Sequence, residues 1–513
     1  MRREESGIVW VDRRRCVGCW MCVLACPFGA VIPSSSRQHA TKCDGCRERP
    51  SPACLDLCEP RHLALRGHAE GAEVAARRRD FAMAGWAWRG IEGYPAPKPP
   101  PATVQTASRP TSRSLHYVIV GGGVAAARAV EAIRRADARG RITVVCAEGT
   151  YPYSRVLLPQ FLAGRVDLPA MWLHPPSWWD AQGVELLRGD PAVGLEAHSR
   201  QVVLASGKAL RYDRLLVATG SRPTRQGIAG ADLAGVATFH GLGDAEAVRD
   251  ARPQAAVIVG GGFVALKAAE GLHAMGAAVT LVVRSRLLRR MLDAASATVV
   301  ERRLRGHGVE VLQGRRVVEV HGQHSRVRGV SLDDGRRLGC DLLVLAAGVQ
   351  PNVDWLAGSG ARVGNGVAVD GRLQTNLPHV WAAGDVAETR DLLAGRPVVN
   401  AIWPSASEQG RLAGACMAGE EISYDGSLAM NTLDVFGLPV ASFGEVSACG
   451  IANAEGNGEV LAHKHYRDGR LVGAVLVGDI SEAGRLLAEA RRHYNALAAQ
   501  RLAEGSKGGR REG

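Results

Sequence analysis

The sequence lacks any apolar run long enough to cross a membrane. A membrane helix needs about 18 or more consecutive apolar residues, and no such run occurs among the 513 residues. The first residues, MRREESGIVWVDRRRC, contain arginines with no apolar core behind them, so they do not form a secretory signal. We therefore expect no membrane span and a cytoplasmic location.

The sequence also lacks the marks of a nucleic-acid-binding protein. Its 63 Lys and Arg residues exceed its 51 Asp and Glu residues, which gives a net charge of +12. However, no basic helix or aromatic-studded sheet motif accompanies this charge. The excess is either ordinary surface charge or a basic docking face for an acidic redox partner or for nucleotide phosphates. We expect no nucleic-acid partner.

Cysteine is scarce after residue 58 but concentrated before it. Eight of the 12 cysteines fall within Cys16–Cys58. In a cytosolic chain such a cluster favours metal ligation over disulfides. The other four stand singly and are most simply core residues. They are Cys146, Cys340, Cys416 and Cys449.

The cluster consists of two motifs. The first, CVGCWMCVLACP at Cys16–Pro27, has the spacing of the bacterial ferredoxin run, including its proline. The second, KCDGCRERPSPACLDLCEP, has a longer middle gap between Cys46 and Cys54, and Glu59 stands where a proline is expected. Paired CxxC elements can also bind structural zinc, but eight cysteines with the ferredoxin proline favour two [4Fe–4S] clusters.

The widened second motif resembles the iron–sulfur electron-transfer subunits that serve molybdenum oxidoreductases, hydrogenases and carbon monoxide dehydrogenases. In such modules the fourth cysteine of each motif ligates the other cluster. The resemblance implies that one cluster is held by Cys16, Cys19, Cys22 and Cys58. The second would be held by Cys43, Cys46, Cys54 and Cys26.

Two units of strand, glycine turn, helix and strand follow a proline-, serine- and threonine-rich stretch at Ile91–Ser114 that is typical of a linker. YVIVGGGVAAA and VIVGGGFVALK each contain a G-x-G-x-x-A turn. Glycines allow the tight turn and the approach of a pyrophosphate, and the helix N-terminus supplies N–H groups to it. After the first turn, Glu148 ends the next strand, where a carboxylate can hold ribose hydroxyls. The repeat predicts two dinucleotide sites.

Further motifs resemble those of the FAD-dependent pyridine-nucleotide oxidoreductases. LLVATGSRP at Leu215–Pro223 and VLAAGVQPN at Val344–Asn352 resemble that family's paired strand-turn motifs, and VWAAGDVAE at Val380–Glu388 resembles its second FAD motif. The segments Tyr151–Gly164 and Trp403–Gly419 look most like the rubredoxin-reductase and nitrite-reductase branch.

This resemblance implies which residues serve each cofactor. Asp385 would hydrogen-bond the flavin ribityl chain, and Tyr153 and Arg155 would lie near the flavin. The residues expected to bind FAD are Gly121, Gly123, Ala126, Glu148, Thr219, Gly220, Gly384 and Asp385. Those expected to bind NAD(P) are Gly260, Gly262, Ala265, Arg284, Arg286 and Gly348.

The expected fold is α/β, with two Rossmann-like domains between a small α+β ferredoxin-like domain and an α+β C-terminal domain. In the last of these, alternating apolar runs predict antiparallel strands with a hairpin at Asp468–Gly469. The predicted ranges are 1–66 for the ferredoxin-like domain, 67–114 for a helical segment and linker, 115–252 and 334–423 for the FAD-binding domain, 253–333 for the NAD(P)-binding domain, 424–490 for a C-terminal interface domain that would form a homodimer, and 491–513 for a basic tail.

The chain lacks the CxxxxC pair and the C-terminal His–Glu motif that disulfide reductases of this superfamily carry. His463 and His465, in LAHKHY, are spaced as residues on one face of a strand, and we expect surface or interface positions for them. Without a thiol pair, the flavin needs another outlet for electrons. A flavin can exchange electrons in pairs with a nicotinamide and singly with an iron–sulfur cluster.

We therefore expect an oxidoreductase that connects NAD(P)H, FAD, two [4Fe–4S] clusters and an external redox protein, such as a carbon monoxide dehydrogenase or a ferredoxin. The alternatives are a non-catalytic electron-transfer subunit of a larger complex and, less favoured, an NAD(P)H oxidase or a disulfide-reductase-like flavoenzyme. Val283 stands where NAD-selective sites carry Asp or Glu, and Arg284 and Arg286 follow it. These arginines favour NADPH if they clamp a 2′-phosphate, and they are otherwise solvated loop charges.

Overall fold

The computed structural model describes residues 114–224, 227–392, 395–446, 451–455 and 460–491, together with the short stretches 2–3, 9–10, 22–23, 31–33 and 40–42. The predicted linker, the tail beyond residue 491 and all predicted cluster ligands except Cys22 lie outside these residues. The chain forms two compact units. The first consists of Met1–Arg113 together with Ile480–Gly513, and the second is Ser114–Asp479. In the first unit, β1 (Arg2–Arg3) pairs with β2 (Val9–Trp10), and β3 (Val31–Pro33) pairs with β4 (Ala40–Lys42).

The second unit begins with a five-stranded parallel sheet that forms the first nucleotide domain. Its order is β23-β11-β5-β6-β7. Its strands are nearly continuous apolar runs, as expected for a sheet that is covered on both faces. The strands are β5 (His116–Val120), β6 (Arg141–Cys146), β7 (Val184–Arg188), β11 (Arg214–Val217) and β23 (Val380–Ala382).

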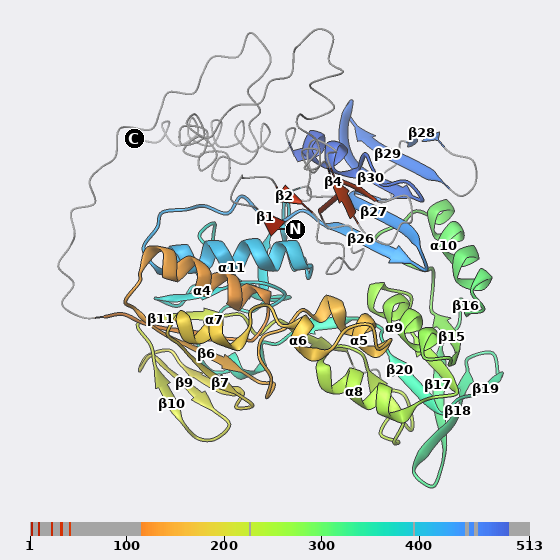
Figure 1. Ribbon diagram of the computed structural model, residues 1–513, viewed down its shortest axis with the longest axis horizontal. Coiled ribbons are helices and arrows are strands. Elements are labelled where there is room, and N and C mark those ends of the chain that lie inside the picture. The colour runs from red at the N-terminus through yellow and green to blue at the C-terminus, as the bar shows by residue number, and fades with distance from the viewer. Residues whose placement is uncertain are drawn as a thin grey trace, which may run out of the picture. The chain divides into compact units, whose positions relative to one another are not determined.

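Each face of this sheet has its own cover. On one face lie the helices α4 (Val124–Ala136) and α11 (Trp403–Met417), side by side in Figure 1. The other face shares a core with the antiparallel sheet of β8 (Ala192–Glu196), β9 (Gln201–Leu204) and β10 (Ala209–Arg211). Between β6 and β7 the chain forms η1 (Arg155–Leu157), α5 (Leu158–Leu162), α6 (Leu168–Met171) and α7 (Pro176–Ala181), of which α5 packs against helices of the second nucleotide domain. The remaining small elements are η2 (Asp354–Leu356), β22 (Val367–Ala368), β24 (Ala387–Arg390) and β25 (Pro397–Val398).

A second parallel sheet repeats this plan, with the order β13-β20-β14-β15-β16. Its strands are β13 (Val236–Thr238), β14 (Ala255–Val259), β15 (Ala278–Val283), β16 (Glu310–Gln313) and β20 (Leu342–Leu345). The helices of this domain are α8 (Leu242–Ala251), α9 (Phe263–Ala274) and α10 (Ala294–Gly306). The sheet takes β13 and β20 from outside 253–333, the range predicted for the NAD(P)-binding domain.

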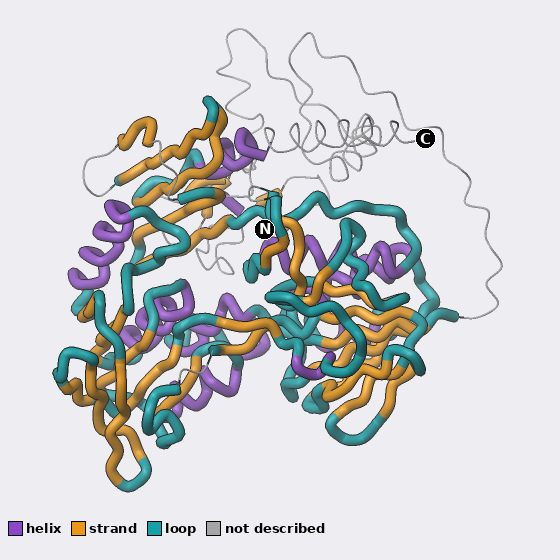
Figure 2. Tube along the Cα trace, turned by 180° about the vertical axis from the view of Figure 1, so that it is seen from behind, coloured by secondary structure: helices purple, strands orange, loops and turns teal. Residues whose placement is uncertain are grey.

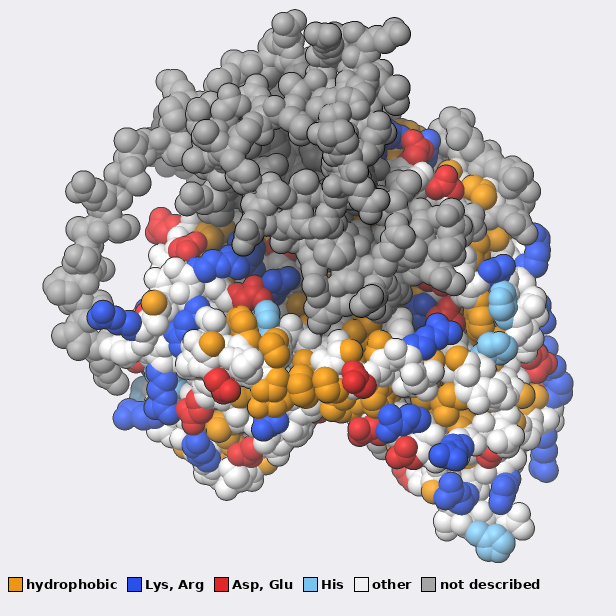
Figure 3. Space-filling view, viewed as in Figure 1, with side chains coloured by type: hydrophobic (Ala, Val, Ile, Leu, Met, Phe, Trp, Pro, Cys, Tyr) orange, Lys and Arg blue, Asp and Glu red, His pale blue; other side chains and the backbone are white. Residues whose placement is uncertain are grey.

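A small antiparallel sheet completes the second domain. It consists of β17 (Val317–Gln323), β18 (Arg326–Leu332) and β19 (Arg337–Gly339). Exposed arginines on and beside these strands include Arg316, Arg326, Arg328 and Arg337. Figure 3 shows basic side chains along this side of the molecule. Part of the net positive charge therefore gathers on the second domain.

Two short strands connect the nucleotide domains. The chain leaves the first domain through β12 (Ser221–Pro223) and returns through β21 (Val349–Pro351), and these strands pair antiparallel. Beside them, Thr219 Oγ1 donates to the carbonyl of Asn352 at 2.8 Å, and Asn352 Nδ2 donates back to the carbonyl of Thr219 at 3.0 Å. The second domain is thus an insertion into the first. Figure 2 shows both sheets from behind, each with helices beside it.

The C-terminal sheet is antiparallel, with the order β26-β27-β30-β29-β28. Its strands are β26 (Met430–Val435), β27 (Leu438–Gly444), β28 (Ile451–Glu455), β29 (Leu461–Arg467) and β30 (Arg470–Val477). The predicted hairpin is confirmed: Asp468 and Gly469 join β29 to β30 with φ of 50° and 70°, as a tight two-residue turn requires.

The C-terminal sheet is attached to the second nucleotide domain by the turn between β26 and β27. Lys267 Nζ on α9 donates to the carbonyl of Asp434 at 2.5 Å, and the Phe436 N–H donates to Glu270 Oε1 at 2.7 Å. Arg303 on α10 donates to the Phe436 carbonyl through Nε at 2.9 Å. Within the described part of the chain, none of the helices has the length and apolar character that crossing a bilayer requires.

Helices α4 and α11 pack with their backbones in contact. Gly410 and Gly414 on α11 face Ala125 and Ala129 on α4, and a Cβ on either glycine would overlap the backbone of the facing alanine. We expect Gly410→Ala to lower the free energy of unfolding by about 1–3 kcal/mol, the usual cost of overpacking a core. Chemical denaturation of the full-length protein measures this loss.

Gly306→Ala is the control, because Gly306 is likewise a helical glycine, at the end of α10, but has no atom within 4 Å of an added Cβ. It should leave stability unchanged or raise it slightly, since alanine is the better helix former. Equal losses in the two variants would contradict the close packing of α4 on α11.

Candidate nucleotide sites and redox centre

The first glycine turn lies between β5 and α4. Gly121 has a φ of +136°, and a Cβ there would overlap the carbonyl of Ala218, at the end of β11. Gly123 is the N-cap of α4 and has no atom within 4 Å of an added Cβ. Ala126 is fully buried. The turn therefore leaves open space in front of the helix N-terminus, where backbone N–H groups can receive a phosphate.

The second glycine turn has the same geometry. Gly260 has a φ of +140°, and its Cβ would overlap the carbonyl of Ala346, just after β20. Gly262 is the N-cap of α9 and again has open space around an added Cβ. Ala265 is fully buried. The residues present fit two dinucleotides, one in each domain.

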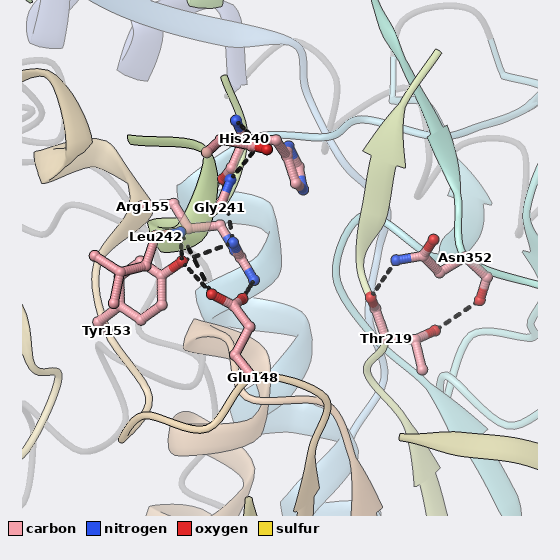
Figure 4. Close-up of polar contacts among 9 residues, drawn as sticks. Glu148, Tyr153, Arg155, Thr219, His240, Gly241, Leu242 and Asn352 are labelled. Carbon is pink, nitrogen blue, oxygen red and sulfur yellow. Dashed lines mark hydrogen bonds and ion pairs between the residues drawn. The ribbon is translucent and has the colours of Figure 1, made fainter. Parts of the chain in front are cut away.

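Glu148, Tyr153 and Arg155 meet near the end of β6 (Figure 4). Arg155 Nη2 donates to Glu148 Oε1 at 2.5 Å, and the Tyr153 hydroxyl donates to Glu148 Oε2 at 2.7 Å. Arg155 Nη1 also donates to the carbonyl of His240 at 3.1 Å, and the Leu242 N–H donates to the Tyr153 oxygen at 2.7 Å. These bonds join the first domain to the start of α8.

The electrostatics of this cluster keep Glu148 ionised. Burial by itself raises the pKa of the Glu148 carboxyl, but Arg155 and the hydrogen bond from Tyr153 outweigh burial, and the net shift is downward. Burial raises the pKa of the Tyr153 hydroxyl. Glu148 is therefore charged but already bonded on both oxygens, and a ribose would add to these bonds.

Asp385 is the second carboxylate predicted to bind FAD, and it lies three residues after the end of β23. It accepts a hydrogen bond from Ser221 Oγ at 2.9 Å. Burial raises its pKa against the opposing effects of Ser221, His240 and Arg155. The preceding Gly384 has a φ of +84° and donates its N–H to Gln409 Oε1 on α11 at 2.8 Å. A carboxylate held this way can accept a further hydroxyl of a ligand.

His240 and Ser221 contact the predicted site residues but were not among them. Burial lowers the pKa of His240, and Arg155 lowers it further, while Ser221 and Asp385 act in the opposite direction. His240 lies just before α8, outside every motif. Ser221 lies within the motif at Leu215–Pro223 and directly follows the predicted Thr219–Gly220 pair, and that position was its signal.

The two predicted coenzyme-selecting arginines have different surroundings. Val283 is buried at the end of β15. Arg284 is exposed and makes no hydrogen bond or ion pair with the residues that the structure describes. Arg286 Nη2 instead donates to the carbonyl of Leu292 at 2.7 Å. Arg284 is thus available to a ligand, whereas Arg286 stabilises its own loop. Gly348, after β20, has a φ of +136°.

Burial disfavours the thiolate form of the three isolated cysteines that the structure describes. Cys146 lies beneath the first glycine turn, and burial, followed by the nearby Glu148, raises the pKa of its thiol to about 12. Burial also raises the pKa of Cys340 to about 11 and that of Cys416. Cys146 and Cys340 are buried, as predicted, Cys416 is half-buried, and Cys449 lies outside the described residues. In the described ranges no group of three or more His, Cys, Asp or Glu side chains could hold a metal ion.

We expected surface or interface positions for His463 and His465, and the structure excludes the surface, because both residues are buried, with exposed fractions of 5% and 1%. His463 Nδ1 pairs with Asp293 Oδ2 at 2.7 Å. The alternation of strand residues correctly placed both histidines on one face. It could not show that this face packs against the second nucleotide domain.

Comparison with known proteins decides the family. The model of the pyridine nucleotide-disulphide oxidoreductases matches residues 115–410, more than half of the chain. The chain belongs to this family. A 4Fe–4S dicluster domain matches residues 1–67, which agrees with the module predicted from the eight cysteines. The predictions of a mixed α/β fold and of an FAD- and NAD(P)-dependent oxidoreductase that carries an iron–sulfur domain are confirmed at this level.

Individual known proteins are similar to much of the chain. The chain is 35% identical over 368 residues to the epsilon subunit of NADH-dependent phenylglyoxylate dehydrogenase from Aromatoleum evansii, with 71% of this chain and 86% of that one covered. It is 32% identical over 379 residues to nitrite reductase [NAD(P)H] from Bacillus subtilis. That match covers 72% of this chain but only 46% of the nitrite reductase. Among solved structures, the ferredoxin reductase for the CYP199A2 system of Rhodopseudomonas palustris has a TM-score of 0.66 and 29% identity, with 71% of this chain and 91% of that one covered.

The Glu148–Arg155 pair yields a prediction about acid stability. We expect Arg155→Gln to lower the free energy of unfolding at pH 7 by about 1 kcal/mol, a modest value because both side chains are partly exposed. The folded pKa of Glu148 lies below its ordinary value of 4.5. The pair therefore stabilises the protein fully above that pH and loses its effect as the pH falls through the folded pKa.

Urea unfolding of both proteins across this pH range measures the difference. Arg141→Gln is the control, since Arg141 forms a 2.7 Å pair with Glu185 on the open surface of the same sheet. Its loss at pH 7 should be smaller. A loss in Arg155→Gln that is independent of pH would show that Arg155 acts by packing alone.

Proposed function

We propose that this chain transfers electrons between NAD(P)H and an external redox protein through FAD and two [4Fe–4S] clusters. One observation supports this most strongly: two glycine turns of equal geometry share a chain with a dicluster domain. Beside the first turn stands a single buried cysteine, Cys146, whose raised pKa disfavours the reactive thiolate. The iron–sulfur module would then accept the electrons of the flavin, as a thiol pair does in disulfide reductases.

The first domain would hold FAD. The open space at Gly123 and the N-terminus of α4 would receive the pyrophosphate, helped by the partial positive charge of the helix end. Asp385 would accept a hydrogen bond from the ribityl chain, with Thr219, Gly220 and Gly384 shaping the backbone around it. Glu148 would accept from the adenosine ribose. Tyr153 and Arg155, which bond to its carboxylate here, would lie near the flavin when FAD is bound. When bound, FAD supplies the exchange between paired and single electrons.

The second domain would hold the nicotinamide coenzyme at Gly260, Gly262, Ala265 and Gly348. Arg284 would contact a 2′-phosphate, and Arg286 would stabilise the loop that carries it. Val283 cannot accept a hydrogen bond from a ribose 2′-hydroxyl, which favours NADPH over NADH. The A. evansii relative is named NADH-dependent, so a direct comparison of the two coenzymes is decisive.

The clusters would be ligated by Cys16, Cys19, Cys22 and Cys58, and by Cys43, Cys46, Cys54 and Cys26. The external partner would be a redox protein such as a ferredoxin or a carbon monoxide dehydrogenase, and its potential would set the direction of electron flow. The C-terminal domain would form a homodimer.

A second candidate is an electron-transfer subunit of a larger dehydrogenase complex, because the A. evansii relative is named a subunit. Isolated protein that reduces a dye with NAD(P)H would show that the chain works by itself. Failure to do so, in protein that contains flavin and iron, would favour the subunit role.

The cysteine cluster yields a test of the route. We expect the double variant Cys19→Ser, Cys22→Ser to lose about four of about eight irons, since one cubane holds four. Anaerobic NADPH should still bleach its flavin absorbance, while its reduction of a ferredoxin should fall at least about tenfold. Cys416→Ser is the control, because this residue lies outside the cluster motifs and should leave both measurements unchanged. Undiminished ferredoxin reduction by the double variant would overturn the proposed route.

The coenzyme assignment has its own test. We expect Arg284→Gln to raise the KM for NADPH about tenfold, as the loss of one charged hydrogen bond to a phosphate would, without changing the KM for NADH. Arg302→Gln, which removes an exposed charge from α10, should change neither. A large preference of the unaltered enzyme for NADH would contradict the assignment.

A further inference from the structure

His463 forms a buried bond between the C-terminal sheet and the second nucleotide domain. It lies on β29, and its Nδ1 is 2.7 Å from Asp293 Oδ2. Both side chains are shielded from solvent, with exposed fractions of 6% and 15%. Their positions in the sequence are 170 residues apart. The pair does not touch either glycine turn, and no motif drew attention to Asp293.

Asp293 is the last residue of the segment Arg284–Asp293, which we call the arginine loop. The loop follows β15 and reads RSRLLRRMLD, so Asp293 is its only carboxylate beside four arginines. These like charges repel one another, and a loop with this composition needs fixed attachments to hold one conformation.

The beginning and middle of the arginine loop are attached to the second glycine turn and to the loop itself. The Leu288 N–H donates to the carbonyl of Gly261 at 2.7 Å, with Leu288 in a left-handed conformation at a φ of 47°. Arg286 Nη2 donates to the carbonyl of Leu292, and the Leu292 N–H donates to the carbonyl of Leu288 at 2.9 Å. The loop therefore folds back against the glycine turn.

The end of the arginine loop is attached through Asp293. As the N-cap of α10, its carboxylate accepts from the Ser296 N–H and from Ser296 Oγ, both at 2.9 Å. His463 supplies the third partner, from a different domain. Burial raises the pKa of Asp293, but the bonds from Ser296 and His463 outweigh it and lower the pKa. The carboxylate is thus ionised and fixed by both α10 and β29.

We propose that His463 is a positioning residue for coenzyme selection. By holding Asp293, it fixes the arginine loop so that Arg284, at the other end, can meet a 2′-phosphate. The C-terminal sheet would then set the coenzyme preference of a domain to which it contributes no ligand. This inference rests on the proposed role of Arg284 as the phosphate contact.

Equilibrium binding of two small probes to the full-length protein tests the proposal. The probes are adenosine 2′,5′-bisphosphate, which carries the 2′-phosphate, and 5′-AMP, which does not. We expect His463→Ala to weaken binding of the bisphosphate about tenfold and that of 5′-AMP less than about twofold, within the usual range of coupling between sites. His463→Asn, whose amide can still donate to Asp293, should restore most of the lost affinity.

Arg467→Gln is the matched control. Arg467 lies on the same strand and pairs with Glu445 Oε2 at 2.5 Å, a contact inside the C-terminal sheet. It should leave both affinities unchanged. If His463→Ala does not fold, His463→Phe fills the same space without the hydrogen bond, and the same selective loss is expected from it.

Three results would contradict the inference or the phosphate contact on which it rests. Equal weakening of both probes would show a general structural role for His463 and overturn the inference. Unchanged bisphosphate binding in the histidine variants, with weakened binding in Arg284→Gln, would overturn the inference alone. Unchanged binding in Arg284→Gln would instead refute the proposed phosphate contact.

Discussion

Both nucleotide domains depend on a backbone-to-backbone contact at the end of one strand. Gly121 and Gly260 adopt φ angles near +140° while their α-carbons face the carbonyls of Ala218 and Ala346. No other residue type fits, because a side chain would occupy the position of the facing carbonyl. This contact turns the chain sharply into α4 and α9 and leaves the space before each helix open. The direction in which each helix leaves its sheet, and the open space at its N-terminus, follow from this contact.

Glu148 and Asp385 are the two carboxylates predicted to bind FAD, and their pKa values are shifted in opposite directions. Glu148 follows β6 and Asp385 follows β23, so they lie on opposite sides of the glycine turn that ends β5. Arg155 and Tyr153 lower the pKa of Glu148, whereas burial with a single hydroxyl partner raises that of Asp385. One acid is therefore a fixed charge, and the other is a hydrogen-bonding group that a neutral ligand can satisfy. The domain thereby carries two carboxylates of different character beside one glycine turn.

The sequence allowed the local features of the fold to be predicted, but not the contacts between distant segments. The glycine turns, the buried strands and the hairpin at Asp468–Gly469 follow from short-range patterns that obey backbone sterics. His240 joins Arg155 and Asp385 through the fold alone, since no sequence motif contains it. The Asp293–His463 pair joins two domains, and alternation along β29 indicated a face but not its neighbour. For Arg286, spacing suggested a phosphate contact, whereas its guanidinium stabilises its own loop.

The packing of α4 on α11 also constrains how the protein folds. Arg128 and Ser407, which hydrogen-bond across these helices, are 279 residues apart. The first domain cannot acquire this helix, or its strand β23, until the ribosome has synthesised the inserted second domain. Closing so long a loop is entropically costly, and a folded insertion shortens it by bringing β12 and β21 together. A second domain that folds before α11 is synthesised would therefore lower the entropic cost of completing the first.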